Sequence, residues 1–247
     1  MNQYQTTADL IKKARRVTAF TGAGISAESG IPPFRGENGL WNQYDPQSLE
    51  IDWFQRHPAE SWRVIHEIFY SAFAKAKPNP AHLTLAEFER RGILKTIITQ
   101  NIDNLHFEAG SQNVLEFHGN SRELICLECG NRILAEKMDL QKLPPLCKIC
   151  GGLLKPDFVF FGEMIPEPTQ TLSFKETELS DLFLLIGTTG AVMPAALIPQ
   201  QAKRNGATIV EINPEESSYT RAITDVFIQN KAGESMQEIL KAFDLLS

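Results

Sequence analysis

The sequence predicts an α/β protein with a mostly parallel sheet and helices on both of its faces. Apolar, β-branched runs typical of buried strands alternate along the chain with segments whose apolar residues recur at helical spacing. Near the N-terminus, a strand ends in a glycine turn that leads into a short helix. In the middle of the chain, all four cysteines fall into two close pairs, which predicts a small inserted domain.

The composition limits the classes of function. The chain has 247 residues, of which 43% are hydrophobic and 22% charged, as in ordinary soluble globular proteins. Its net charge of −6 gives no overall basic field, so direct binding of nucleic acid is not expected. The N-terminus lacks a basic segment followed by an apolar core, and no run approaches the roughly 20 apolar residues of a membrane span. We therefore expect a cytoplasmic protein without a membrane partner.

The first motif follows a helix expected at residues 8–16 and a strand at 17–20. It has the spacing Gly-x-Gly-x-x-Ala, beginning at Gly22, and residues 26–29 start a short helix. Gly22 permits a tight turn, and Gly24 lets the backbone approach a ligand while free helix N–H groups face an anion. The spacing fits a dinucleotide site, but it also fits a plain turn, and by itself it does not decide between them.

Polar residues follow two of the predicted strands. Residues 100–104 come after the strand at 94–99, and His118 comes after the strand at 114–117. In open α/β sheets, the carboxyl ends of strands mark ligand crevices. His118 is therefore a candidate for chemistry, although a packed or capping histidine is the alternative. The remaining expected elements are helices at 58–76 and 81–91, strands at 155–163, 181–186 and 207–212, and a closing helix at 233–246.

Three further segments can contact ligands. The loop at 35–46 is polar, rich in glycine and bears aromatic residues, so it can close over a ligand or be a surface loop pinned by its aromatics. A strand at 155–163 with a free edge could pair with an extended peptide. The glycine turn at 187–194 is expected to enter a helix, which would make a site for an anion or a substrate backbone.

The cysteines are Cys126, Cys129, Cys147 and Cys150, two Cys-x-x-Cys pairs separated by 17 residues. Disulfides are the alternative, but a chain without an export signal stays in a reducing compartment, which favours a metal. Four cysteines would fill every tetrahedral position, so the expected ion is one structural Zn²⁺. The zinc would hold together residues 122–153, a stretch too short to bury its own core.

The order of these motifs resembles that of the sirtuin family of NAD-dependent protein deacylases. The resemblance covers essentially the whole chain, through GAGISAESGIPPFRG, TQNIDNLH, FHGN, the two CxxC pairs, FFGE, GTTGAVMPAA and EINPE. It implies a large Rossmann-like NAD-binding domain made of residues 1–35, 92–120 and 154–247. Residues 36–91 and 121–153 would form a small domain with the zinc ribbon, and NAD would lie between the two.

The resemblance also implies a reaction. The carbonyl oxygen of an acyl-lysine protein or peptide attacks the ribose carbon that carries nicotinamide, so NAD is consumed as a co-substrate and the acyl group ends on ADP-ribose. His118 matches the base that takes a proton from a ribose hydroxyl, a task that suits an imidazole. Asn101 and Asp103 match the residues that position the nicotinamide ribose and carboxamide, and they complete the catalytic set.

The family's binding residues carry over position by position. Those around NAD correspond to Gly22, Ala23, Gly24, Ser26, Glu28, Phe34, Arg35, Gln100, Asn101, Ile102, Asp103, Gly187, Thr188, Thr189, Asn213, Pro214, Glu215 and Ala232. Those that would contact the peptide correspond to Val159, Phe160, Phe161, Gly162, Glu163 and Val192.

The chain departs from the family pattern in three places. Phe160 stands where a tryptophan is usual, and Thr189 stands where a serine is usual, which affects preference more than activity. Sirtuins that favour succinyl or malonyl lysine carry a Tyr-x-x-Arg pair, and the family's spacing places His66 and Phe69 at those positions. Without the arginine, a buried acyl carboxylate would lack a cation, so we expect acetyl or other uncharged acyl groups.

Two other function classes stay open at this point. A mono-ADP-ribosyltransferase or an NAD glycohydrolase would use the same NAD site without a peptide groove. A non-catalytic NAD-sensing module would need no base, and His118 argues against it.

Overall fold

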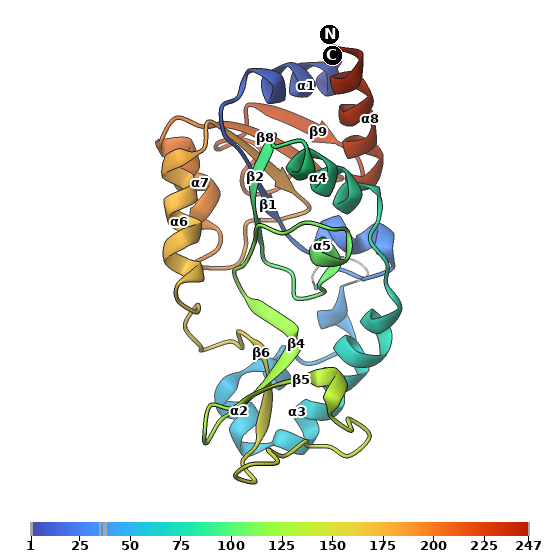
Figure 1. Ribbon diagram of the computed structural model, residues 1–247, viewed down its shortest axis with the longest axis vertical. Coiled ribbons are helices and arrows are strands. Elements are labelled where there is room, and N and C mark those ends of the chain that lie inside the picture. The colour runs from blue at the N-terminus through green and yellow to red at the C-terminus, as the bar shows by residue number, and fades with distance from the viewer. Residues whose placement is uncertain (1, 35, 37–38, 247) are drawn as a thin grey trace.

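The computed structural model describes residues 2–34, 36 and 39–246, and it contains two sheets (Figure 1). All neighbouring strands of the larger sheet are parallel, in the order β3-β2-β1-β7-β8-β9. Its strands are β1 (Val17–Thr21), β2 (Leu94–Thr99), β3 (Val114–Glu116), β7 (Leu182–Ile186), β8 (Thr208–Asn213) and β9 (Val226–Gln229). The predicted parallel sheet is confirmed.

Helices cover both faces of this sheet. On one side lie α1 (Gln3–Lys13), α4 (Pro80–Arg90) and α8 (Ala232–Leu245), and on the other α6 (Thr169–Leu179) and α7 (Leu197–Arg204) (Figure 1). Successive strand residues point to opposite faces. Accordingly, Leu182, Leu184 and Ile186 pack into one apolar core, whereas Phe183 and Leu185 pack into the other.

A second body, at the lower end in Figure 1, contains a three-stranded antiparallel sheet. Its strands are β5 (Arg132–Leu134), β4 (Gly119–Cys126) and β6 (Leu154–Phe158), and its helices include α2 (Ile51–Arg56), α3 (Pro58–Ile65) and the π-helical stretch η4 (His66–Ala72). Trp62 is fully buried there, and its Nε1 donates a hydrogen bond to the carbonyl of Leu154 at 2.9 Å. Helices and sheet therefore share one core.

Strand pairing bears on the division of the chain. β4 starts directly after His118 and runs into the smaller sheet, where β6 pairs with it. Residues 154–158 therefore lie with the smaller sheet, whereas we expected the large domain to resume at residue 154.

Several expected helix bounds need correction. The helix expected at 8–16 begins at Gln3, because the Asn2 side chain caps it by accepting a hydrogen bond from Gln5 N, and it ends at Lys13. The single helix expected at 58–76 becomes α3, η4 and the 3₁₀ turn η5 (Phe73–Lys75). The short helix expected at 26–29 is the 3₁₀ helix η1 (Ala23–Ser29). After the glycine turn at 187–194, α7 does not begin until Leu197.

Other elements carried no clear sequence pattern. They are α2, α6, β5, β9, the short helix α5 (Leu105–Glu108) and the 3₁₀ turns η2 (Leu40–Asn42), η3 (Pro46–Leu49) and η6 (Ala135–Lys137). The strand expected at 155–163 ends at Phe158. Within the part of the chain that the structure describes, no helix is both long and apolar enough to cross a membrane.

Candidate active site

Two glycine turns cross at the carboxyl edge of the parallel sheet. The N–H of Gly24 donates to the carbonyl of Gly187 at 2.9 Å. A Cβ on Gly24 would lie 2.7 Å from the Cα of Gly187, and Gly187 itself has a φ of +64°, so neither position admits a side chain without distortion. The turns after β1 and β7 are thus packed backbone against backbone. Such an edge offers main-chain N–H groups to a ligand.

Asn101 and Asp103 follow β2 and lie against the first glycine turn. Nδ2 of Asn101 donates to the carbonyl of Gly22 at 3.1 Å. Asp103 accepts a hydrogen bond from Ser26 Oγ at 2.6 Å and another from Leu105 N at 3.0 Å. Burial raises the pKa of Asp103, and these two hydrogen bonds counteract the rise. Sequence-predicted residues from two separate motifs therefore meet here.

His118 joins this group through the backbone of Gln100. Its Nδ1 lies 3.2 Å from the Gln100 carbonyl oxygen, which can only accept, so Nδ1 carries the proton and Nε2 keeps a free lone pair. Burial lowers the pKa of His118, which keeps the imidazole neutral near pH 7. The ring therefore has the protonation state and tautomer of a general base.

Glu28 and Gln100 form hydrogen bonds that link separate segments at the carboxyl edge of the parallel sheet. The Glu28 carboxylate accepts from the N–H of Gly233 at 2.6 Å, which ties η1 to the start of α8 beside Ala232. Gln100 Nε2 donates to Thr188 Oγ1 at 3.0 Å and links the end of β2 to the second glycine turn. The carboxylate of Glu28 is thus engaged with the protein's own backbone.

The remaining residues expected around NAD are spread along the same edge. Asn213 ends β8, and its Nδ2 donates to the Thr188 carbonyl at 3.0 Å. Thr189 follows Thr188 in the glycine turn, and Pro214 and Glu215 leave the sheet directly after Asn213. Ile102 packs into the core of the smaller body.

The aromatic residues of the loop at 35–46 lie on the smaller body. The ring of Phe34 lies 5.1 Å from that of Trp41 and 6.4 Å from that of Phe69. Trp41 in turn lies 6.3 Å from the ring of Phe161. Arg35, which we expected near the diphosphate, lies outside the described residues.

Two buried histidines behind Ser26 were missed by the sequence reasoning. His82 Nε2 lies 3.5 Å from Ser26 Oγ, and His106 Nε2 lies 2.9 Å from Thr21 Oγ1. Burial lowers the pKa of His82 to about 4 and that of His106 well below its ordinary value. Their presence in the segments Pro78–His82 and TQNIDNLH was the available signal.

The segment expected to contact a peptide is partly paired within the protein. Phe161 N donates to the Leu49 carbonyl, and its own carbonyl accepts from Ile51 N. One edge of this segment is therefore occupied by residues 49–51. The side chain of Phe161 is 42% exposed, and that of Met193 is 63% exposed.

Its other members differ in exposure. Phe160 is buried, with its ring 5.2 Å from that of Phe54, so it packs into the core of the smaller body. Glu163 accepts hydrogen bonds from Phe160 N and, at 3.0 Å, forms an ion pair with Lys155. Val159 N donates to the His118 carbonyl, which places this segment directly beside the candidate base. Gly162 and the half-buried Val192 complete the set.

The four cysteines converge in the smaller body, with all four Sγ atoms within 4.8 Å of one another. The Sγ atoms are 3.5 Å apart for Cys126 and Cys150 and 3.8 Å apart for Cys129 and Cys147. These separations exclude disulfides and match the edge of about 3.8 Å expected for a tetrahedron of thiolates around Zn²⁺. Hydrogen bonds from the backbone N–H groups of Cys150 and Ile149 lower the pKa of Cys147 to about 7, which favours the thiolate. The donor set fits structural zinc.

Comparisons with known proteins agree with this geometry. Residues 22–194 match the model of a family described as the Sir2 family. The chain is 45% identical over 238 residues to NAD-dependent protein deacylase 2 of Pyrobaculum aerophilum, covering 95% of this chain and 93% of that protein. It is 44% identical over 244 residues to the NAD-dependent protein deacylase of Pyrococcus furiosus, covering 96% and 97%.

Solved structures give the same result. A Sir2 homologue in complex with NAD superposes with a TM-score of 0.90 at 40% identity, covering 98% of this chain and 95% of that one. A complex of Sir2 with a p53 peptide and NAD⁺ superposes with a TM-score of 0.90 at 34% identity, covering 99% and 100%.

Proposed function

Because this chain belongs to the Sir2 family, we propose that it is an NAD-dependent protein-lysine deacylase, which transfers the acyl group to ADP-ribose and releases nicotinamide. One observation carries the proposal. His118 presents a free Nε2 from a ring that is anchored to Gln100, the residue that precedes Asn101. A base and the residues expected to hold the reacting ribose are thus fixed by one short stretch of backbone.

The chain's own residues provide binding and proton transfer. Bound NAD supplies an electrophilic ribose carbon with nicotinamide as its leaving group. His118 accepts a proton from a ribose hydroxyl at Nε2, with Nδ1 held by Gln100 so that the ring cannot rotate away. Asp103, steadied by Ser26, holds the ribose and carboxamide together with Asn101.

The crossing of the two glycine turns supports NAD binding at this edge. Side chains at Gly22 or Gly24 would collide with the backbone of Gly187, so these positions of the turn carry no side chain. A bare turn lets a diphosphate approach main-chain N–H groups. Thr188 and Asn213, joined by a hydrogen bond, stand on the side expected to take the adenosine.

The peptide lies as a strand between residues 160–163 and 190–193. The exposed side chains of Phe161 and Met193 support this placement, because both present apolar surface to solvent. Phe161 also lies two residues after Val159, whose N–H donates to the His118 carbonyl. The opposite edge of this segment is already paired at Phe161, whose N–H and carbonyl bond to Leu49 and Ile51. Only one side of the segment is therefore available for a peptide strand.

We also propose a preference for acetyl over acidic acyl groups. Phe69 is buried, with its ring 5.0 Å from that of Phe158, 5.4 Å from that of Phe73 and 6.4 Å from that of Phe34. This aromatic surround suits an uncharged acyl chain, whereas a carboxylate would lose its hydration there, and none of these three described ring partners of Phe69 carries a positive charge. His66, at the position of the family's tyrosine, is a half-buried residue whose Nδ1 lies 3.4 Å from Ser71 Oγ.

One experiment separates this function from its alternatives. The protein is incubated with NAD and matched acetyl-lysine and succinyl-lysine peptides, and product masses are recorded. The proposal expects free lysine peptide and O-acetyl-ADP-ribose, with much slower turnover of the succinyl peptide. ADP-ribose attached to the peptide would instead identify a transferase, and free ADP-ribose with intact acetyl peptide would identify a glycohydrolase. Comparable turnover of both peptides would refute only the acyl preference.

A further inference from the structure

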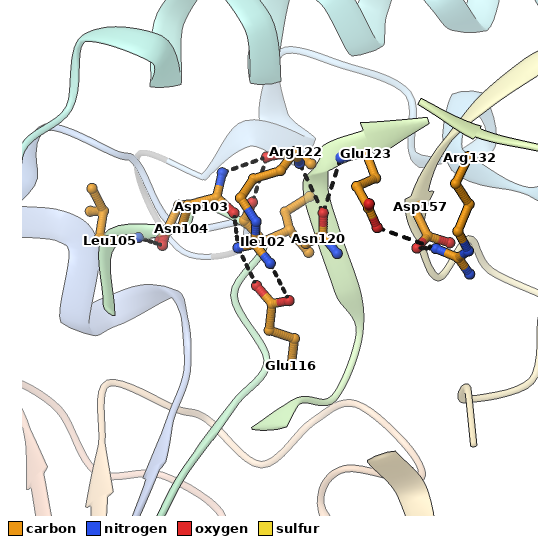
Figure 2. A network of polar contacts seen from close by, with 11 residues as sticks. Ile102, Asp103, Asn104, Leu105, Glu116, Asn120, Arg122, Glu123, Arg132 and Asp157 are labelled. Carbon is orange, nitrogen blue, oxygen red and sulfur yellow. Dashed lines mark hydrogen bonds and ion pairs between the residues drawn. The ribbon is translucent and has the colours of Figure 1, made fainter. Parts of the chain in front are cut away.

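Arg122 on β4 contacts two segments that frame the candidate site (Figure 2). Its Nη1 and Nη2 donate to the two carboxylate oxygens of Glu116, each at 2.7 Å. The same Nη1 donates to Oδ1 of Asn104 at 2.6 Å. The guanidinium also lies 4.7 Å from the ring centroid of Phe107. Arg122 is therefore fixed by a two-pronged ion pair, an amide and an aromatic face.

The ion pair closes a turn around His118. Glu116 lies two residues before His118, and Arg122 lies four residues after it. Between them the chain bends at Gly119, whose φ is +74° and where a Cβ would lie 2.2 Å from the Asp157 carbonyl oxygen. The Arg122–Glu116 pair thus ties together the two arms of the bend that carries the candidate base.

The contact with Asn104 fixes the loop that carries Asp103. Asn104 has a φ of +67°, and it is the one non-glycine residue with positive φ in the described chain. Its Oδ1 accepts from Arg122, and its Nδ2 donates to Ser121 Oγ at 3.3 Å. Ser121 Oγ donates in turn to the Ile102 carbonyl at 2.7 Å. β4 therefore holds the residues on both sides of Asp103, as Figure 2 shows.

The shape of the guanidinium matters for this arrangement. The side chain of Glu116 is only 15% exposed, so it needs a partner that satisfies both of its oxygens. Arg122 does so while it also reaches Asn104. The ammonium of a lysine is a single point of charge and cannot reproduce this fork.

We propose that Arg122 is a positioning residue, which holds the His118 turn and the Asp103 loop in the relative placement that the reaction requires. Arg122 acts through Glu116 and Asn104 and does not touch the reacting atoms. This inference rests on the proposed deacylase function. Its physical basis is that a shift of about 1 Å between reacting groups can cost roughly 100-fold in rate.

The test uses three variants of the full chain and one control. Arg122→Gln removes the fork, and Arg122→Lys keeps only the charge. Asn104→Gly keeps the left-handed backbone but removes the side-chain link. The control is Arg132→Gln, because Arg132 also lies in the smaller sheet and forms ion pairs there, with Glu123 and Asp157, but donates to neither Glu116 nor Asn104 (Figure 2). Each protein is assayed with NAD and an acetyl-lysine peptide, well below its melting temperature.

We expect Arg122→Gln to lower kcat by about 10- to 100-fold with little change in the Kd of NAD, and Arg122→Lys to restore part of the loss. Combining Arg122→Gln with Asn104→Gly should cost about as much as Arg122→Gln alone, because the two side chains act as one unit. Arg132→Gln should turn over like the wild type.

Wild-type kcat in Arg122→Gln, or losses that multiply in the double variant, would overturn the inference. If Arg122→Gln does not fold, Asn104→Gly decides alone, and unchanged kcat in that variant would overturn it. A wild-type protein that leaves NAD and the acetyl peptide intact would instead refute the proposed function.

Discussion

Nδ1 of His118 lies 3.2 Å from the carbonyl oxygen of Gln100, so the imidazole at the end of β3 is anchored to the backbone at the end of β2. These two strands are parallel neighbours in the sheet. Their adjacency brings together two motifs that are separate in the sequence. The arrangement fixes which imidazole nitrogen can act as a base.

Replacing His118 with alanine should leave NAD binding nearly intact and lower acetyl-lysine turnover by roughly 10²- to 10⁴-fold, the contribution of a positioned base. NAD affinity by calorimetry and turnover by peptide mass check the two parts. His57→Ala is the matched control, because His57 stacks on Trp53 in the smaller body, away from this edge. Wild-type turnover in His118→Ala would remove His118 from the mechanism.

The pH dependence of kcat/KM should report the same group. Only neutral His118 can accept a proton, so kcat/KM rises with pH as the imidazole loses its charge. Because burial lowers the pKa of His118, the midpoint should lie below the ordinary value of about 6.5, with a plateau at pH 7. Initial rates from pH 5 to 8, with folding checked by circular dichroism at each pH, test this. A midpoint above 6.5 would contradict it.

Acid should destabilise the protein through His82. Burial lowers the pKa of His82 to about 4, so between pH 6.5 and 4 the unfolded chain binds a proton that the folded chain excludes. This contribution to the free energy of unfolding is fully present above pH 6.5. It decreases as the pH falls toward 4, and the total loss is about 3 kcal/mol. Urea unfolding at several pH values measures it. His82→Gln should make the free energy of unfolding depend less steeply on pH, whereas the control His57→Gln should leave this slope unchanged. Equal slopes in His82→Gln and the wild type would show that His82 does not cause the acid destabilisation.

Removing one zinc ligand should unfold residues 122–153, the stretch that the zinc would hold together. Cys147→Ser should lose zinc and lower the melting temperature, because the binding energy of a structural zinc is folding energy. Zinc content by mass spectrometry and melting by circular dichroism provide the measurement. Lys148→Ser, at an exposed position between two ligands, is the control. An unchanged melting temperature in metal-free Cys147→Ser would show that the cluster has no structural role.

Local patterns were enough to predict much of the fold. β2 begins and ends as predicted, because its β-branched run is buried almost throughout. The four cysteines converge as their spacing indicated. In contrast, α6 lacks a clear apolar stripe, and the π-helical stretch at His66 continues the helical pattern of α3 without a break in the sequence.

The site was harder to predict where long-range contacts decide it. The pairing of Phe161 with residues 49–51 depends on a segment more than a hundred residues away, so the sequence suggested a free edge without indicating that the other edge is occupied. Glu28 matches a family residue near NAD, and only the folded structure shows that its carboxylate accepts a hydrogen bond from the N–H of Gly233. Arg122 stands in no recognised motif, and only the folded structure brings it to Asn104 and Glu116.

We expect NAD cleavage and lysine deacylation to be one coupled reaction, and the stoichiometry of their products measures this coupling. Nicotinamide, deacetylated peptide and remaining NAD are quantified over time, with acetyl-lysine peptide and with the same peptide lacking the acetyl group. We predict one nicotinamide for each acetyl group removed and stable NAD with the unacetylated peptide. NAD loss at the same rate with either peptide, or loss of acetyl groups without NAD, would contradict it.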